Sequence, residues 1–167
     1  MGGFLRIAAV LVVGWILVTQ VRGCMMSDED HLRGLIADAE EGWNSADATE
    51  AVEPLADDFV LAPFRQGKPW LRGILQNIFM YNRDPKTHDF IWEATIDWDT
   101  VDLKFVDAEH THAQIRGQVS LLRSDGRSEG NYDGAFGVEA RKREGDWEIV
   151  AAGLQGLGNF RGRARTK

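Results

Sequence analysis

The apolar residues of this chain change their spacing near Asp89, and this change restricts the possible folds more than any other feature. Before Asp89 they recur every three or four positions, which is typical of the buried stripe of a helix. After Asp89 apolar and polar residues alternate, which is typical of strands that bury one face. Helices that come first and strands that follow predict an α+β domain, and 167 residues provide for one such domain.

Three helices are expected in the first half of the chain. The first spans about residues 28–44, with Ser27 as a suitable N-terminal cap. The second spans about residues 47–58 as one kinked or two short pieces, because Pro54 lacks the amide donor that a helix needs there. The third spans about residues 69–81 and starts with a proline, which is favoured in the first turn.

Four alternating segments make up the second half. In the first of them the alternation changes phase between Trp98 and Val101, which predicts a β-bulge that bends the strand. The apolar residues of the four segments are Phe90, Trp92, Ala94, Ile96, Trp98, Val101, Leu103 and Phe105; Ala113, Ile115, Gly117, Val119 and Leu121; Tyr132, Gly134, Phe136, Val138 and Ala140; and Trp147, Ile149 and Ala151.

The turn between the second and third segments predicts which residues lie opposite one another. Asp125-Gly126 is typical of a two-residue hairpin turn, and such a turn pairs Ile115 with Phe136. The same register places His112 opposite Glu139 on the other face of the sheet. Apolar residues therefore face apolar residues, as they must if one face of the sheet is buried.

Two further turns agree with this arrangement. A loop at residues 108–110 places Leu103 opposite Ile115, and the last turn of the chain places Phe136 opposite Gln155. We therefore expect a strongly bent, antiparallel sheet with one apolar face, over which the three helices lie.

An apolar leader precedes the domain. Residues 4–21 are apolar apart from Arg6 and a few polar residues at the end, and the acidic stretch 27–30 follows. This charge asymmetry favours an N-terminus that stays inside and a domain that is exported. We therefore interpret residues 1–24 as a signal or anchor segment.

The residues before Cys24 resemble a bacterial lipobox, which predicts lipidation of Cys24. The alternatives are an uncleaved anchor helix and a cleaved, soluble form. All three place the domain in the cell envelope, outside the cytoplasm.

Charge excludes one class of partner. The formal net charge is −7, although the tail at residues 157–167 is basic. The rest of the chain is therefore strongly acidic, which argues against binding to nucleic acid. We expect the basic tail to be disordered. A single cysteine excludes an internal disulfide and a multi-cysteine zinc site.

The order of elements resembles the NTF2-like superfamily, and its SnoaL-like branch in particular. The resemblance covers residues 28–156 and includes a strand at Asp58-Phe59-Val60, a loop with Gly67 and a terminal hairpin at residues 143–149. It implies a cone-shaped α+β fold in which helices pack on a bent, mixed or antiparallel sheet, with a pocket between them. The superfamily contains cyclases, dehydratases and isomerases as well as non-catalytic binding modules, so the fold alone does not choose an activity.

Few polar groups fall on the predicted pocket face. The expected pocket residues are Trp92, Trp98, Tyr132, Phe136 and Gln155. No Asp, Glu or His shares that face, which favours binding of a small apolar ligand without catalysis, cofactor or metal. The alternatives are a SnoaL-like lyase or isomerase that acts on a small hydrophobic substrate, and an assembly module that forms a homodimer. Tyr132 itself is either a core aromatic residue or a group that orients the ligand.

Two other clusters have simpler interpretations. His110 and His112, with Glu139, could bind a metal, but the preferred interpretation is an exposed hairpin with a cross-strand ion pair. Asp97 and Asp99 could act as paired carboxylates, but a solvated strand face explains them as well.

Overall fold

The computed structural model describes residues 26–62, 64–128 and 130–154. The expected leader, Cys24, Gln155 and the basic tail lie outside these residues. Within them, no helix is both long enough and apolar enough to cross a membrane.

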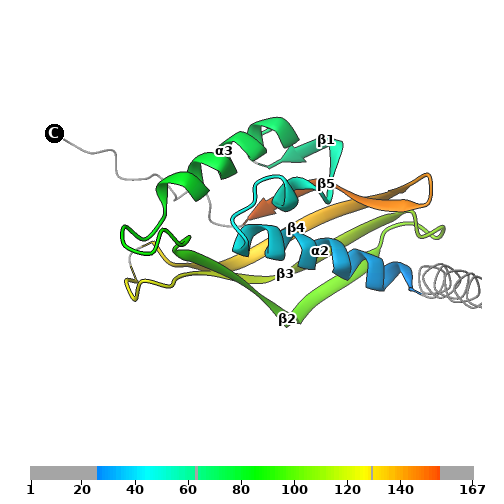
Figure 1. Ribbon diagram of the computed structural model, residues 1–167. Helices are drawn as coiled ribbons and strands as arrows, with labels where there is room; N and C mark the ends of the chain where they lie inside the picture. Colours follow the sequence, from blue (N-terminus) through cyan, green and yellow to red (C-terminus); the bar gives the residue numbers. More distant parts are fainter. Residues whose placement is uncertain (1–25, 63, 129, 155–167) are drawn as a thin grey trace, which may run out of the picture. The chain divides into compact units, whose positions relative to one another are not determined.

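The described chain contains two α-helices, one short 3₁₀ helix and five strands (Figure 1). In chain order these are α2 (Asp28–Asn44), η1 (Glu50–Val52), β1 (Leu55–Leu61), α3 (Lys68–Tyr81), β2 (Trp92–Phe105), β3 (His112–Arg123), β4 (Tyr132–Arg143) and β5 (Asp146–Leu154). The strands form one mixed sheet in the order β1-β5-β4-β3-β2. β1 runs parallel to β5, and the other neighbours are antiparallel.

The expectation of three α-helices is wrong, because no second α-helix forms in the described chain between Asp47 and the first strand. The Asp47 carboxylate accepts hydrogen bonds from the backbone N–H groups of Thr49 and Glu50, at 2.7 and 3.2 Å, which closes a turn. Only the three residues of η1 follow. The carbonyl of Pro54 then accepts a hydrogen bond from Ile149 N, and the chain enters the sheet.

The other two helices lie where the sequence predicts them. Ser27 caps α2 through a capping box, in which its hydroxyl accepts from Asp30 N and the Asp30 carboxylate accepts from Ser27 N. α3 begins one residue before Pro69 and ends at Tyr81.

The bulge in β2 is confirmed. The pairing of β2 with β3 shifts between Asp97 and Asp102, and the ribbon bends there (Figure 1). The Thr100 hydroxyl donates to Asp97 O and accepts from Gln118 N, at 2.7 and 2.9 Å. This side chain therefore provides a partner for an N–H group of β3 at the place where the ladder is interrupted.

The β2–β3 register is confirmed, whereas the β3–β4 register is wrong by two residues. Leu103 lies opposite Ile115, as expected, but Ile115 lies opposite Val138 rather than Phe136. The cause is a longer connection, residues 124–131, in place of a two-residue turn. A shift of two residues leaves every side chain on its face, so the apolar face survives the error.

Two other expected pairs are also wrong, one because of the same shift and one because of a second bulge. His112 lies opposite Arg141 rather than Glu139. The pairing of β4 with β5 shifts between Glu139 and Ala140, so Phe136 lies opposite Leu154. Leu154 thus takes the place opposite Phe136 that was expected for the next residue.

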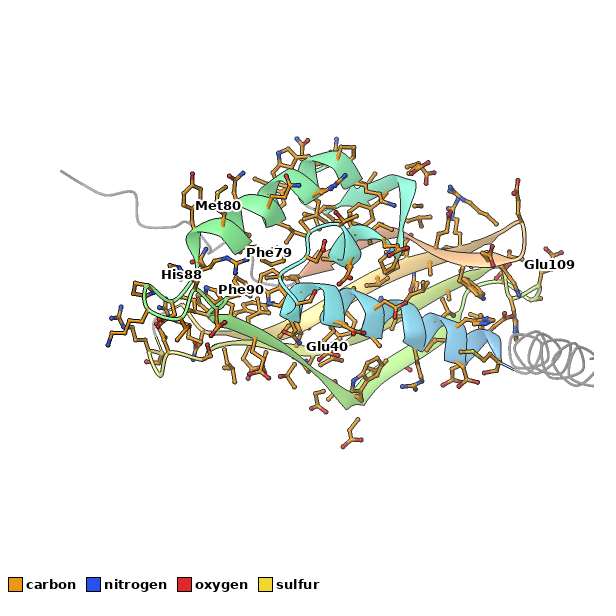
Figure 2. The ribbon with its side chains drawn as sticks, in the orientation of Figure 1. Glu40, Phe79, Met80, His88, Phe90 and Glu109 are labelled. Carbon is orange, nitrogen blue, oxygen red and sulfur yellow. The ribbon has the colours of Figure 1, made fainter. Side chains whose placement is uncertain are left out.

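The core lies between the inner face of the sheet, defined here as the face that carries Ile115 and Phe136, and the two helices. Its buried residues include Leu32 and Ile36 from α2, Leu75 and Phe79 from α3, and Ile115, Phe136, Ala140, Trp147 and Ile149 from the sheet. Three aromatic rings, those of Trp43, Phe79 and Phe90, meet edge to face with centroids 4.9–5.7 Å apart. Figure 2 shows Phe79 and Phe90 pointing toward one another between α3 and the start of β2.

Candidate functional site at the end of the inner sheet face

Three half-buried residues lie on the inner face beyond the packed core. They are Trp92 on β2, Leu121 on β3 and Tyr132 on β4, and we call them the inner-face patch. Leu121 lies directly opposite Tyr132, and Trp92 is two residues from Ala94, which lies opposite Leu121 on the other side. The three residues come from neighbouring strands at the end of the sheet where β3 connects to β4.

Glycines make room for the aromatic rings on this face. A Cβ atom on Gly134 would lie 2.4 Å from the Tyr132 hydroxyl oxygen, so the Tyr132 side chain lies against this glycine. A Cβ atom on Gly117 would lie 2.7 Å from the Phe136 ring. Phe136 lies directly opposite Gly117 and is buried, so its ring fills the core.

The Tyr132 hydroxyl is the polar group of the patch. Burial raises the pKa of Tyr132, and the neighbouring Asp133 carboxylate adds to the shift. The hydroxyl therefore keeps its proton at neutral pH and can donate a hydrogen bond.

Trp92 is held between α3 and the loop that connects β3 to β4. Its Nε1 donates to the Asn82 side-chain oxygen at 3.4 Å. The Arg123 guanidinium lies 5.3 Å from the centroid of the Trp92 ring, which is a cation–π distance. Arg123 is itself oriented by Asp125, which accepts from its Nε at 2.9 Å. One face of the Trp92 ring is therefore covered by a cation whose position is set by the loop.

The five predicted pocket residues do not form one group. Trp92 and Tyr132 belong to the inner-face patch, together with Leu121, which the sequence analysis assigned to the apolar face but not to the pocket. Phe136 is a core residue. Trp98 lies at the bulge with 36% of its surface exposed, outside the patch. Gln155 lies outside the described residues.

The alternative catalytic and metal clusters have structural explanations. His110 stacks on Phe105 with centroids 4.1 Å apart. His112 Nε2 and Glu139 Oε2 are 3.8 Å apart on the outer face, so these side chains approach one another although their residues are not paired. Asp97 Oδ1 accepts from Asp99 N within the bulge. No group of three or more His, Cys, Asp or Glu residues able to hold a metal occurs among the residues that the structure describes.

An acidic groove was missed by the sequence analysis. It has a volume of about 670 Å³ and lies between α2, η1 and the turn from β4 to β5. Its charged lining residues are Asp38, Glu41, Glu50, Glu53, Asp146 and Glu148. They come from three separate segments, so no local sequence pattern could have indicated that they meet.

Two helices with the first strand between them, followed by the other four strands of a mixed sheet with an apolar inner face, define an α+β protein with the NTF2-like fold. The structure is similar to an NTF2-like protein with a cystatin-like fold from Novosphingobium aromaticivorans, at 16% identity and a TM-score of 0.58, over 83% of this chain and 86% of that one. No protein-family model and no curated protein matches the sequence.

Two of the similar structures belong to proteins named for an activity. One is a putative scytalone dehydratase from Novosphingobium aromaticivorans, with 15% identity, a TM-score of 0.59 and coverage of 76% of this chain and 82% of that one. The other is a hexachlorocyclohexane dehydrochlorinase from Novosphingobium barchaimii, with 15% identity, a TM-score of 0.60 and coverage of 76% and 84%. At such identities the likeness concerns the fold alone.

Proposed function

We propose that this chain is an exported, membrane-tethered NTF2-like domain that binds a small apolar ligand at the inner-face patch without catalysis. The observation that carries the proposal is the patch itself: Trp92, Leu121 and Tyr132 are half-buried, lie beyond the packed core and share one face. Such a surface matches a ligand that is mostly apolar.

The absence of an acid–base group on this face favours binding over catalysis. The inner-face positions of the described strands β2 to β5 hold no Asp, Glu or His, and no charged side chain of the described chain is buried. A lyase or isomerase needs a positioned proton donor or acceptor at the substrate. The two similar structures that are named for an activity share only the fold with this chain. On this face, the lyase alternative has no residue that could act as the proton donor or acceptor.

A matched pair of leucines tests the ligand site. Leu121 lies on the inner face, whereas its neighbour Leu122 points to the outer face and is about half exposed. With the full chain in detergent, Leu121→Gln should weaken binding of a fluorescent apolar probe about tenfold, since the patch loses part of its apolar surface. Leu122→Gln should leave binding unchanged. Equal effects of the two substitutions would contradict the proposal.

A second experiment identifies the ligand. Native mass spectrometry of the wild-type chain from its own host would show a co-purifying ligand.

The tether is proposed from the leader and Cys24, and it has its own test. A Cys24→Ser variant should lose incorporation of a radiolabelled fatty acid and should keep its unprocessed length on a gel. If labelling and migration stay the same, Cys24 is not the lipidated residue. The domain is then either attached through an uncleaved helix or not attached.

The outer face of the sheet supports a second candidate function, as a homodimeric assembly module. A groove of about 210 Å³ on this face is lined by small residues, among them Gly137 and Ala151, and by the polar residues Gln114, Arg116 and Glu139. A Cβ atom on Gly137 would meet nothing within 4 Å, so this glycine leaves the sheet backbone open to close approach by another surface. Light scattering of the full chain in detergent would show a dimer that Gly137→Arg dissociates, whereas a strict monomer would remove this candidate.

A further inference from the structure

The acidic groove gathers negative charge that the described chain does not neutralise. Its six carboxylates come in pairs from α2, from the segment with η1 and from the start of β5, and no basic residue lines it. Among the described residues only Arg143 comes within 4 Å of one of them, at 3.8 Å from Glu148. Two hydrogen bonds already hold the Arg143 guanidinium on Asp58. Charges of one sign that line a cleft produce a concentrated field, which here attracts cations.

The chain itself contains a segment with the opposite charge. Residues 161–167 read RGRARTK, with four basic residues and no acidic one. The four cations occupy every second position: Arg161, Arg163, Arg165 and Lys167. Successive side chains of an extended chain point in opposite directions, so an extended segment with this pattern presents all four cations on one side.

We propose that residues 161–167 bind in the acidic groove of their own domain. The extended segment places one cation about every 7 Å along a groove in which each of the three lining segments contributes two carboxylates. On sequence alone the tail is expected to be disordered, because the groove forms only when the domain folds. Charge complementarity between the groove and the segment identifies the occupant.

The chain between the groove and this segment has a suitable length. β5 begins at the groove, with Asp146 and Glu148, and the described chain ends at Leu154 (Figure 1). From Glu148 to Leu154 the strand covers about 20 Å. Residues 155–167 cover up to ~43 Å when extended, so they can turn back and still reach the groove. Residues 155–160 are uncharged and include Gly156 and Gly158, which allow the chain to reverse its direction.

The short connection favours the chain's own segment over that of a second copy. Only residues 155–160 separate Leu154 from Arg161, and a short flexible linker holds its two ends at a millimolar effective concentration. A second copy reaches such a concentration only in very concentrated protein. Contacts between exposed charges are individually weak, so they form first where the partner is always close.

This contact is separate from the proposed ligand site, because the acidic groove and the inner-face patch share no residue. Its consequence concerns other partners. With residues 161–167 in place the groove is occupied by the chain itself, and a cationic partner has to displace them.

Photo-cross-linking of the full chain in detergent tests the inference. The photoreactive amino acid p-benzoylphenylalanine replaces Ala164, which lies between two of the arginines, and mass spectrometry identifies the peptides that it labels. We expect labelling of peptides from residues 35–54 or 146–148. The yield should fall as the salt concentration rises, because salt screens contacts between exposed charges.

Two matched triple variants separate the groove from the general charge of the domain. The first removes half of the groove's carboxylates and should lower the yield about fivefold: Asp38→Asn, Glu41→Gln and Glu53→Gln. The second changes the net charge equally at exposed positions outside the groove and should leave the yield unchanged: Glu93→Gln, Asp99→Asn and Glu109→Gln. A variant of the segment itself, Arg163→Gln with Arg165→Gln, should lower the yield as the groove variant does, and it leaves the described domain unaltered.

Three outcomes would overturn the inference. The first is labelling mainly outside the groove, and the second is an equal effect of the two triple variants. The third comes from an equal mixture of isotopically labelled and unlabelled chains. Cross-linked peptides that combine the two isotopes would show that a second copy supplies the segment.

Discussion

The side chain of Asn44 makes two hydrogen bonds with the backbone of Ala94. Its Oδ1 accepts from Ala94 N at 2.7 Å, and its Nδ2 donates to Ala94 O at 2.9 Å. Asn44 ends α2, and Ala94 lies on β2, which is an edge strand of the sheet. Glu40, one turn earlier, accepts from Ile96 N at 2.9 Å (Figure 2). Two side chains of α2 thus satisfy backbone groups that an edge strand would leave unpaired.

Replacing Asn44 should therefore destabilise the domain. We expect Asn44→Ala to lower the free energy of unfolding by about 1–3 kcal/mol, because two partly buried backbone groups of Ala94 lose their partner. Urea unfolding of the full chain in detergent measures this. Asn77→Ala is the control, since the exposed Asn77 side chain donates to the Gly73 carbonyl of its own helix. An equal loss for both variants would contradict the role of Asn44 at the strand edge.

Two glycines of α2 should respond to alanine in opposite directions. A Cβ atom on Gly42 would lie 2.3 Å from the backbone nitrogen of Ala51, so Gly42→Ala should destabilise the domain by about 1–3 kcal/mol or more. A Cβ atom on Gly34 would meet nothing within 4 Å, so Gly34→Ala should stabilise the helix by about 0.5–1 kcal/mol. Thermal unfolding of the two variants compares them directly. Stabilisation by Gly42→Ala would show that α2 and the chain at Ala51 are farther apart.

A second glycine pair tests how closely Tyr132 is seated. Gly134→Ala would place a methyl group against the Tyr132 hydroxyl, so the ring must move and binding of an apolar probe at the patch should fall about tenfold. Gly137→Ala, on the same strand, meets nothing within 4 Å and should leave probe binding unchanged. If both variants bind the probe as the wild-type chain does, the patch is not the binding site.

Acid should weaken the hairpin between β2 and β3 through Asp107. Its carboxylate accepts from the Thr111 hydroxyl and from the backbone N–H groups of Thr111 and His112, and these hydrogen bonds lower the pKa of Asp107 to about 2. The pKa is depressed from 3.8, so the stabilisation is present above that value and is lost as the pH falls through about 2. The effect is modest because Asp107 is only partly shielded from solvent.

Asp107→Asn should remove part of this dependence. Stability measured by urea unfolding from pH 5 to pH 2 should fall less steeply in Asp107→Asn than in the wild-type chain. Asp57→Asn, an exposed carboxylate on β1, serves as the control and should keep the wild-type slope. Identical slopes for the wild-type chain and the Asp107 variant would contradict the assignment.

The candidate site could be predicted in part. The alternation of apolar residues placed Trp92 and Tyr132 on the inner face, because side chains on a strand point to opposite faces in turn. It could not separate Phe136 from them. Only the pairing of Phe136 with Gly117 shows that its ring fills the space above a glycine and belongs to the core.

The sequence by itself determined the fold class, the bulge in β2 and the identity of the inner face. These follow from local patterns, and the face survives even a register error of two residues, as the pairing of Ile115 with Val138 shows. Tertiary structure decided the β3–β4 register, the loss of the second α-helix, the acidic groove and the contact of Asn44 with Ala94. Each of these depends on loop length or on residues that are distant along the chain, and no local preference encodes such distances.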